Sequence, residues 1–202
     1  EDGIRDYKVT GVQTCALPIL LNTDFSIFPT LSTERLILKE MTLADAQVLF
    51  EMRRNPTLMK YIDRPIPGSI NDIHDLIEKM LQMKRNGDGI SWGIYKKENP
   101  ELNIGNIGFF RIIAEHYRAE IGYMLQEEEQ QKGIMFEAIQ ALIKFGFEKM
   151  NLHSIEANIN PANEASRKLL EKAGFVKEAY FRENYFFNGQ FIDSEIYSLI
   201  NR

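Results

Sequence analysis

The chain has 202 residues, the length of one ordinary domain with room for an extra element. Its hydrophobic (44%), charged (26%) and aromatic (11%) fractions exclude a disordered, collagen-like or low-complexity protein. The 24 Lys and Arg against 29 Asp and Glu leave a net charge of −5, so no global basic field exists and we expect no nucleic-acid partner. The single cysteine, Cys15, forms no internal disulfide, and no apolar run approaches the ~20 residues that span a bilayer. We therefore expect a soluble, cytoplasmic protein that does not act at a membrane.

Residues 1–23 show no sustained helical or strand period, and we expect them to form a disordered or artefactual leader. The short apolar patch at 15–21 follows acidic residues, whereas a signal peptide would carry a basic flank. The run DGIRDYKVTGVQTCALPI also resembles translated sequencing-adapter sequence. A natural mobile terminus is the alternative interpretation, and both exclude the segment from the functional site.

The first regular segments are a strand over 35–39 and two helices over 42–55 and 69–86. Each helix begins with a Thr or Ser that is followed three residues later by Asp, which is typical of a capping box. Pro56 is expected to end the first helix and Gly87 the second.

The rest of the chain alternates between strand and helix patterns. Strands are predicted over 91–96, 103–112, 117–125, 154–159, 175–187 and 190–200, and helices over 134–149 and 163–172. The order β-α-α-β-β-β-α-β-α-β-β predicts an α/β (mixed α+β) fold, a mixed sheet with helices on both faces. No internal repeat or linker divides it, so residues 31–202 are expected to form one domain.

The loop over 126–133 has the features of a phosphate site. Gly133 directly precedes a helix, so unpaired backbone N–H groups and the positive end of the helix dipole converge there. Lys132 adds a positive charge beside the three glutamates at 127–129. On these features alone, a plain turn and a solvated acidic loop remain the simpler interpretation.

A second motif is Asn163-Glu164-Ala165-Ser166, which precedes Gly174-Phe175. Taken alone, Asn163 is a natural helix N-cap and Ser166 an ordinary first-turn residue. Together with the strand, loop, helix and strand before it, however, the order resembles the GNAT superfamily of acetyl-CoA-dependent N-acetyltransferases.

Within that superfamily the chain is most similar to the Rim-type ribosomal-protein serine/alanine N-terminal acetyltransferases, from about residue 31 to the C-terminus. The motifs behind this resemblance are Thr33-Glu34-Arg35-Leu36, Ala119-Glu120-Ile121-Gly122-Tyr123, Glu137-Ala138, Asn163-x-x-Ser166, Glu171-Lys172-Ala173-Gly174-Phe175 and Asn188-Gly189-x-x-x-Asp193. The resemblance implies a mostly antiparallel twisted GNAT sheet, acetyl-CoA as co-substrate, direct acetyl transfer without an acyl-enzyme, and no metal.

The resemblance also implies cofactor-binding residues. The family's phosphate loop, Gln/Arg-x-x-Gly-x-Gly/Ala, falls on Gln130, Gln131, Lys132, Gly133, Ile134 and Met135, and departs from the pattern only at Met135. The backbone N–H of Met124 or Leu125 is expected to stabilise the thioester carbonyl, where the central strand splays from strand 154–159. Ser166 is the candidate group beside the sulfur, and Asn163 a pantetheine contact.

The general base is less clearly indicated. Glu120 alternates with Gly122 and Met124 on one face of its strand and could reach the acceptor, although a structural carboxylate paired with Arg118 or Arg111 explains it as well. Glu183 and Tyr185 near the last hairpin compete for the role, directly or through water. His116 and His153 lie at predicted strand edges and are weaker candidates.

The preferred function is acetylation of a protein N-terminal α-amine, expected to be that of a ribosomal protein. The alternatives are a small-molecule acetyltransferase for a polyamine, aminoglycoside or amino acid, and a catalytically silent acyl-CoA-binding module. The helices at 42–86, with Asp63 and Arg64 in their connection, are expected to wall the acceptor side without distinguishing these acceptors. A monomer and a homodimer fit the sequence equally.

Overall fold

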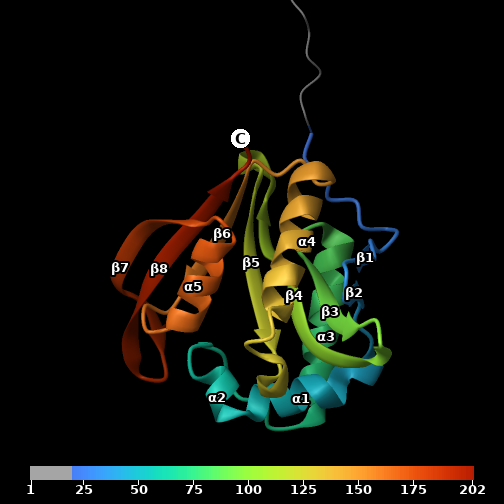
Figure 1. The fold of residues 1–202 in the computed structure, drawn as a ribbon. Helices are drawn as coiled ribbons and strands as arrows, with labels where there is room; N and C mark the ends of the chain where they lie inside the picture. The colour runs from blue at the N-terminus through green and yellow to red at the C-terminus, as the bar shows by residue number, and fades with distance from the viewer. Residues whose placement is uncertain (1–19) are drawn as a thin grey trace, which may run out of the picture.

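One eight-stranded sheet runs through residues 20–202, the part of the chain that the computed structural model describes (Figure 1). The strands are β1 (Leu31–Ser32), β2 (Leu36–Glu40), β3 (Ile90–Lys96), β4 (Asn99–Ile113), β5 (Arg118–Leu125), β6 (Ser154–Ile159), β7 (Val176–Phe187) and β8 (Gln190–Ile200). Their order in the sheet is β1-β2-β3-β4-β5-β6-β8-β7. Among the strands that the structure describes, only β5 and β6 run parallel, so the expected mixed, mostly antiparallel sheet is confirmed.

Within residues 20–202, five helices and three 3-10 turns connect the strands. The helices are α1 (Ala46–Arg54), α2 (Pro56–Met59), α3 (Ile70–Asn86), α4 (Ile134–Glu148) and α5 (Glu164–Lys172), and the turns are Leu43–Asp45, Ala114–His116 and Glu127–Glu129. The predicted helix over 42–55 is thus a 3-10 turn followed by α1, and Pro56 starts α2 instead of only ending α1. Proline suits a first helical position, and the Asn55 side chain caps α2 by accepting from the N–H groups of Thr57 and Leu58.

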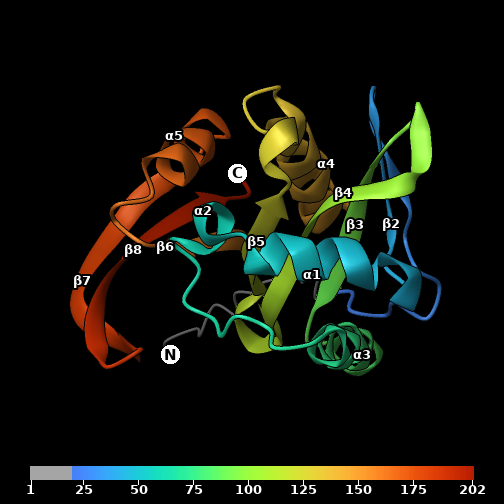
Figure 2. The ribbon, with the colours of Figure 1, turned by 90° about the horizontal axis from the view of Figure 1, so that it is seen from below.

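The helices cover both faces of the sheet, as expected. Figure 2 shows α4 and α5 on one face and α1 and α3 on the other. The alternation of β4 explains this division: Ile107 and Phe109 are buried with the apolar side of α4, while Phe110 packs against a second cluster, which includes Ile73 and Ile77 of α3.

Residues 20–30 also lie against this domain. Phe25 is 4% exposed within the main core, the Trp92 indole donates to the Pro29 carbonyl at 2.6 Å, and the Asn22 N–H donates to the Met150 carbonyl at 2.8 Å. Most of the predicted leader, residues 1–19, lies outside the described residues.

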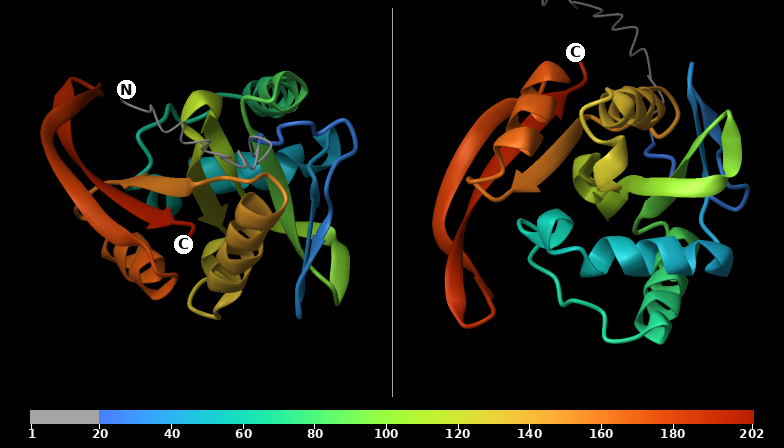
Figure 3. Two further views of the ribbon diagram at one scale, coloured as in Figure 1. Left: turned by 90° about the horizontal axis from the view of Figure 1, so that it is seen from above. Right: turned by 60° about the horizontal axis from the view of Figure 1, so that its bottom comes forward.

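The parallel pairing of β5 and β6 is short. It joins only residues 118–120 to residues 154–156, whereas β6 pairs with β8 along its whole length. Beyond Glu120 the two strands diverge, and α1 and α2 lie at the end of the sheet toward which they diverge (Figures 1 and 3). A register shift in β4 between Phe109 and Arg111, opposite Glu120, adds local twist at this point.

Candidate active site

Beyond Glu120, the edge of β5 that faces β6 has unpaired backbone groups. The Gln126 N–H donates to the Ile104 carbonyl at 2.9 Å, which sets the alternation of the β4–β5 ladder. The Met124 N–H therefore faces β4, and those of Tyr123 and Leu125 face away from it, toward the unpaired side. Of the two N–H groups proposed for the thioester carbonyl, that of Leu125 has the suitable direction.

The N-terminus of α4 has the geometry of an anion site. Gly133 caps the helix with φ 76°, Gln131 precedes it with φ 61°, and no side chain caps the first turn. The first-turn N–H groups consequently lack partners within the helix. Met135, where the family pattern is broken, is 8% exposed and packs into the core, so its bulk lies away from these N–H groups.

Two of the three glutamates before α4, Glu127 and Glu129, have hydrogen-bond or ion-pair partners. Lys96 approaches the Glu129 carboxylate to 2.6 Å and Lys132 to 3.3 Å. Burial alone would raise the pKa of Glu129, but these two cations hold it below its usual range. Glu127 accepts from the Asn55 side-chain amide at 3.1 Å. The loop therefore repels a phosphate less strongly than three unpaired glutamates would.

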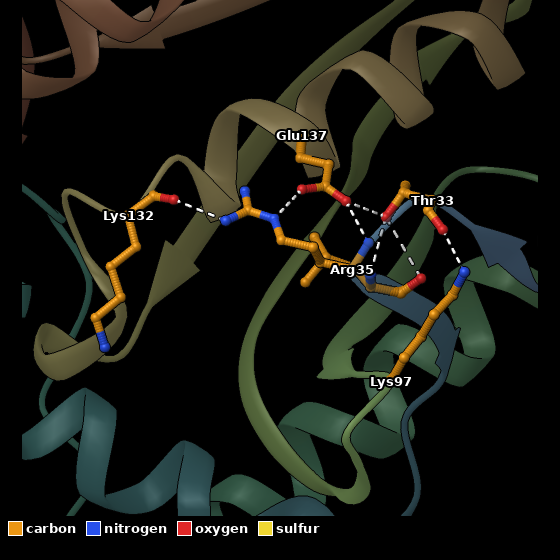
Figure 4. A network of polar contacts seen from close by, with 6 residues as sticks. Thr33, Arg35, Lys97, Lys132 and Glu137 are labelled. Carbon is orange, nitrogen blue, oxygen red and sulfur yellow. Dashed lines mark hydrogen bonds and ion pairs between the residues drawn. The ribbon is translucent and has the colours of Figure 1, made fainter.

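A polar network fixes the phosphate loop to the start of β2 (Figure 4). Glu137 accepts from the Thr33 hydroxyl at 2.5 Å, from the Arg35 N–H at 2.8 Å and from Arg35 Nε at 2.7 Å. Arg35 Nη1 then donates to the Lys132 carbonyl at 3.0 Å, and Lys97 donates to the Thr33 carbonyl. Sequence reasoning singled out the Thr33-to-Leu36 and Glu137-Ala138 motifs but assigned this tie to neither.

Ser166 has a partner that the sequence did not indicate. Its hydroxyl lies 2.6 Å from the Tyr123 hydroxyl, and its N–H donates to the Asn163 side chain at 3.1 Å, which confirms Asn163 as the N-cap of α5. Burial raises the pKa of Tyr123 to about 12, although the bond to Ser166 opposes the shift. The pair is therefore protonated at neutral pH and stands beside the divergence of β5 from β6.

Glu120 lies on the other face of β5. Met124, four residues further along β5 and on the same face as Glu120, packs against Met52 and Met59 of the α1–α2 segment. This face of β5 is therefore the one that α1 and α2 cover. Arg111 Nη2 approaches Glu120 to 2.7 Å and Glu156 to 3.4 Å, so Glu120 does have the arginine partner considered above. Its pKa is nevertheless raised, because burial outweighs Arg111 and Glu156 adds a like charge.

Tyr185 is placed beside the connection between α2 and α3. Arg64 Nη1 donates to the Tyr185 hydroxyl at 2.9 Å, and that hydroxyl lies 3.4 Å from the Asp63 carbonyl. Glu183 is exposed and has φ 52°, with its N–H donating to Asp193 at 2.8 Å. These contacts place the β7–β8 hairpin against the α2–α3 connection, which the sequence predicted to wall the acceptor side.

Other candidate groups are less well placed. His116 and His153 are both exposed; His116 ends the 3-10 turn before β5, and His153 directly precedes β6. Residues 20–202 bring together no three side chains that could hold a metal ion. Within the same range no helix has the length and apolarity needed to cross a bilayer.

Comparisons with known proteins agree with this geometry. Residues 35–176 match the family model described as acetyltransferase (GNAT) domain. The chain is 36% identical over 174 residues to the uncharacterised N-acetyltransferase YoaA of Bacillus subtilis, covering 86% of this chain and 98% of YoaA. It is 30% identical over 133 residues to the [ribosomal protein uS5]-alanine N-acetyltransferase of Escherichia coli, covering 65% of this chain and 63% of that enzyme.

Solved structures share the fold. A spermidine N-acetyltransferase from Vibrio cholerae, crystallised with CoA and spermine, superimposes with a TM-score of 0.73 at 22% identity, covering 83% of this chain and 96% of that one. This structural match shows that the overall fold is shared. The chain belongs to the GNAT family and is an acetyl-CoA-dependent N-acetyltransferase.

Proposed function

We propose that the protein acetylates the N-terminal α-amine of a protein, with a ribosomal protein as the preferred acceptor class. The observation that carries this proposal is the change in exposure across the site. Ser166 is buried at the thiol side, whereas Arg64 and Tyr185 at the acceptor side are exposed. A chain end can reach such a site while the rest of the acceptor stays outside. The identity to the uS5-alanine N-acetyltransferase supports the same acceptor class.

The proposed cofactor site uses the α4 N-terminus and the edge of β5. The N–H groups from Lys132 to Met135 bind the pyrophosphate, with Gln130 and Gln131 completing the loop. The side-chain amide of Gln130 donates to the Leu125 carbonyl at 3.2 Å, so this residue acts by shaping the loop. Asn163 contacts the pantetheine arm, which lies along the unpaired edge of β5.

In the proposed reaction the neutral amine nitrogen attacks the thioester carbonyl carbon. The Leu125 N–H stabilises the oxyanion, the C–S bond breaks, and the Tyr123–Ser166 pair gives the departing thiolate a proton. The proton lost by the amine passes to the Glu120 carboxylate, whose pKa is raised by burial and which is therefore a stronger base than an exposed glutamate. The Tyr123–Ser166 pair and Glu120 lie on opposite faces of β5, so donor and base do not compete for one position.

An acceptor screen tests this proposal. The protein is incubated with acetyl-CoA and, separately, with peptides that begin with free Ser or Ala, the same peptides with a blocked N-terminus, spermidine, an aminoglycoside and free amino acids. Thiol release gives the rate, and mass spectrometry locates the acetyl group. We expect acetylation of the free N-terminal peptides and none of the blocked ones.

Other outcomes would contradict the proposal in different ways. Turnover confined to spermidine or an aminoglycoside would assign a small-molecule acetyltransferase instead. Tight acetyl-CoA binding without turnover on any amine would assign a silent acyl-CoA-binding module.

A further inference from the structure

Arg53 is a cation whose Nε has no hydrogen-bond partner within the described part of the chain. It lies in the last turn of α1, next to Met52, whose side chain is buried against Met124 of β5. Its Nε atom is shielded from solvent and has no hydrogen-bond partner among residues 20–202, and no described carboxylate lies within ion-pair distance of its guanidinium. A shielded polar group without a hydrogen bond is costly, so Arg53 is a candidate for contact with a bound acceptor or cofactor.

Arg64 adds a second guanidinium on the same side of the sheet. Among residues 20–202 its hydrogen bonds go to the Tyr185 hydroxyl and to the Asp63 carbonyl, both of which are neutral acceptors. Burial lowers the pKa of Arg53, and the charge of Arg64 lowers it further. The same charge acts to lower the pKa values of Asp63 and Glu120, against the larger effect of their burial. Asp63 and Glu120 already act on Arg64, so an anion is favoured chiefly beside Arg53, whose Nε has no hydrogen-bond partner among residues 20–202.

We infer that Arg53 and Arg64 bind a carboxylate of the acceptor, on the side of the site where its amine meets Glu120. This inference rests on the proposed function, because it concerns the acceptor of the same reaction. A planar guanidinium matches a carboxylate with two parallel hydrogen bonds. The carboxylate has two possible sources: an acidic side chain close behind the N-terminal residue of a peptide, or the α-carboxylate of a free amino acid.

The remaining charges nearby agree with an acceptor that carries both signs. Asp63 has a raised pKa, chiefly because it is partly buried, and Glu120 is already paired with Arg111. These acids face the amine, whereas Arg53 and Arg64 would repel the additional ammonium groups of a polyamine. The loop before α4 reaches the end of α1, where the Asn55 side-chain amide donates to Glu127 at 3.1 Å, so the acetyl-CoA affinity of Arg53→Gln is what separates an acceptor carboxylate from the cofactor pyrophosphate.

The test compares acceptors that differ in one charge. The wild-type protein is given Ser-Asp and Ser-Asn peptides of otherwise identical sequence, free serine with serinamide, and spermidine, and kcat and KM are measured for each. We expect the Ser-Asp peptide or free serine to exceed its neutral analogue at least about tenfold in kcat/KM, mainly through KM. Which pair shows the preference identifies the source of the carboxylate.

Two substitutions assign the preference to the arginines. Arg53→Gln and Arg64→Gln should each lower the ratio of acidic to neutral acceptor about tenfold, with acetyl-CoA affinity by calorimetry unchanged. Arg54→Gln is the matched control, because Arg54 is the next arginine of α1, stands over the Phe50 ring and should leave the ratio as it is. Arg64 is exposed, so Arg64→Gln should fold and can test the inference even if Arg53→Gln does not fold.

Several results would overturn the inference. Equal kcat/KM for acidic and neutral acceptors, or a preference for spermidine, would show that no acceptor carboxylate is recognised. A loss of acetyl-CoA affinity in Arg53→Gln would assign Arg53 to the cofactor. If neutral amines are acetylated and acidic ones are no better, only this inference fails; if no amine is acetylated, the proposed function fails and takes the inference with it.

Discussion

The tie between Glu137 and the start of β2 makes a prediction with a calculable size. Glu137→Gln keeps the shape of the side chain, but it removes the negative charge and turns one acceptor oxygen into an NH₂ group. That group then faces the Thr33 and Arg35 donors, which now bond to the carboxylate at 2.5 to 2.8 Å. The substitution therefore leaves donors against donors in a partly buried place.

The magnitude follows from the exposure of the partners. A hydrogen bond to a charged group contributes about 1.5–3 kcal/mol, and the exposed half of the Arg35 side chain reduces its share by solvent screening. A net loss of about 2 kcal/mol in the free energy of unfolding is expected. For a chain of this size that lowers Tm by about 4–8 °C.

The dependence on pH gives a second signature. Burial alone would raise the pKa of Glu137, but the Thr33 and Arg35 donors hold it below its usual value. Its stabilisation is then fully present above the unfolded pKa of about 4.3 and is lost as the pH falls through the lower folded value. The difference in Tm between wild type and Glu137→Gln should therefore be largest near neutral pH and shrink below about pH 4.

Thermal unfolding over a pH series measures both effects, with Glu128→Gln as control because Glu128 is an exposed neighbour in the acidic run. Acetyl-CoA affinity should also fall severalfold in Glu137→Gln, since Arg35 would no longer hold the Lys132 carbonyl. A Tm equal to that of the control at neutral pH would refute the assignment of this network as a structural tie.

Three further outcomes are expected. Gly133→Asp should weaken acetyl-CoA binding by at least about tenfold in calorimetry, because a carboxylate would meet the pyrophosphate. Gly189→Asp, at a similar positive φ in open space, controls for backbone strain, and equal acetyl-CoA affinities of the two variants would remove the phosphate-loop assignment. Ser166→Ala should lower kcat and kcat/KM together by about 10²–10⁴-fold with acetyl-CoA affinity within about threefold, whereas near-normal turnover would leave Ser166 a helix residue. Removal of residues 1–19 should shift Tm by less than about 2 °C, while Phe25→Ala should cost about 3–5 kcal/mol; the reverse order in thermal melts would contradict the domain start.

Local signals were enough to predict most of the fold. The capping box at Ser69 and the left-handed Gly87 bound α3, and the alternation of residues 154–159 gives β6 with the bounds that the structure has. Each of these elements is specified by residues within it or next to it. The division of α1 and α2 was missed because Pro56 signals both the end of one helix and the start of another.

The side-chain partners of the site were harder to predict. Ser166 and Tyr123 are 43 residues apart, and Arg64 and Tyr185 are 121 apart, so each pair exists only once the sheet is assembled. The missing partner of Arg53 is likewise a property of packing, since nothing in the α1 sequence distinguishes Arg53 from Arg54. Sequence reasoning found the motifs but could not assign these contacts.

The short pairing of β5 with β6 also bears on how the molecule folds and exchanges hydrogen. Only three residue pairs join the five strands before it to the three strands after it, and they are the one parallel register in the sheet. Parallel strands pair only after a long crossover, here α4, has been ordered, so the two parts of the sheet can form as antiparallel units before they join. The Tyr123 and Leu125 amides, unpaired in the free protein, would exchange rapidly with solvent and become protected when a pantetheine chain lies along β5, which makes them reporters of cofactor occupancy.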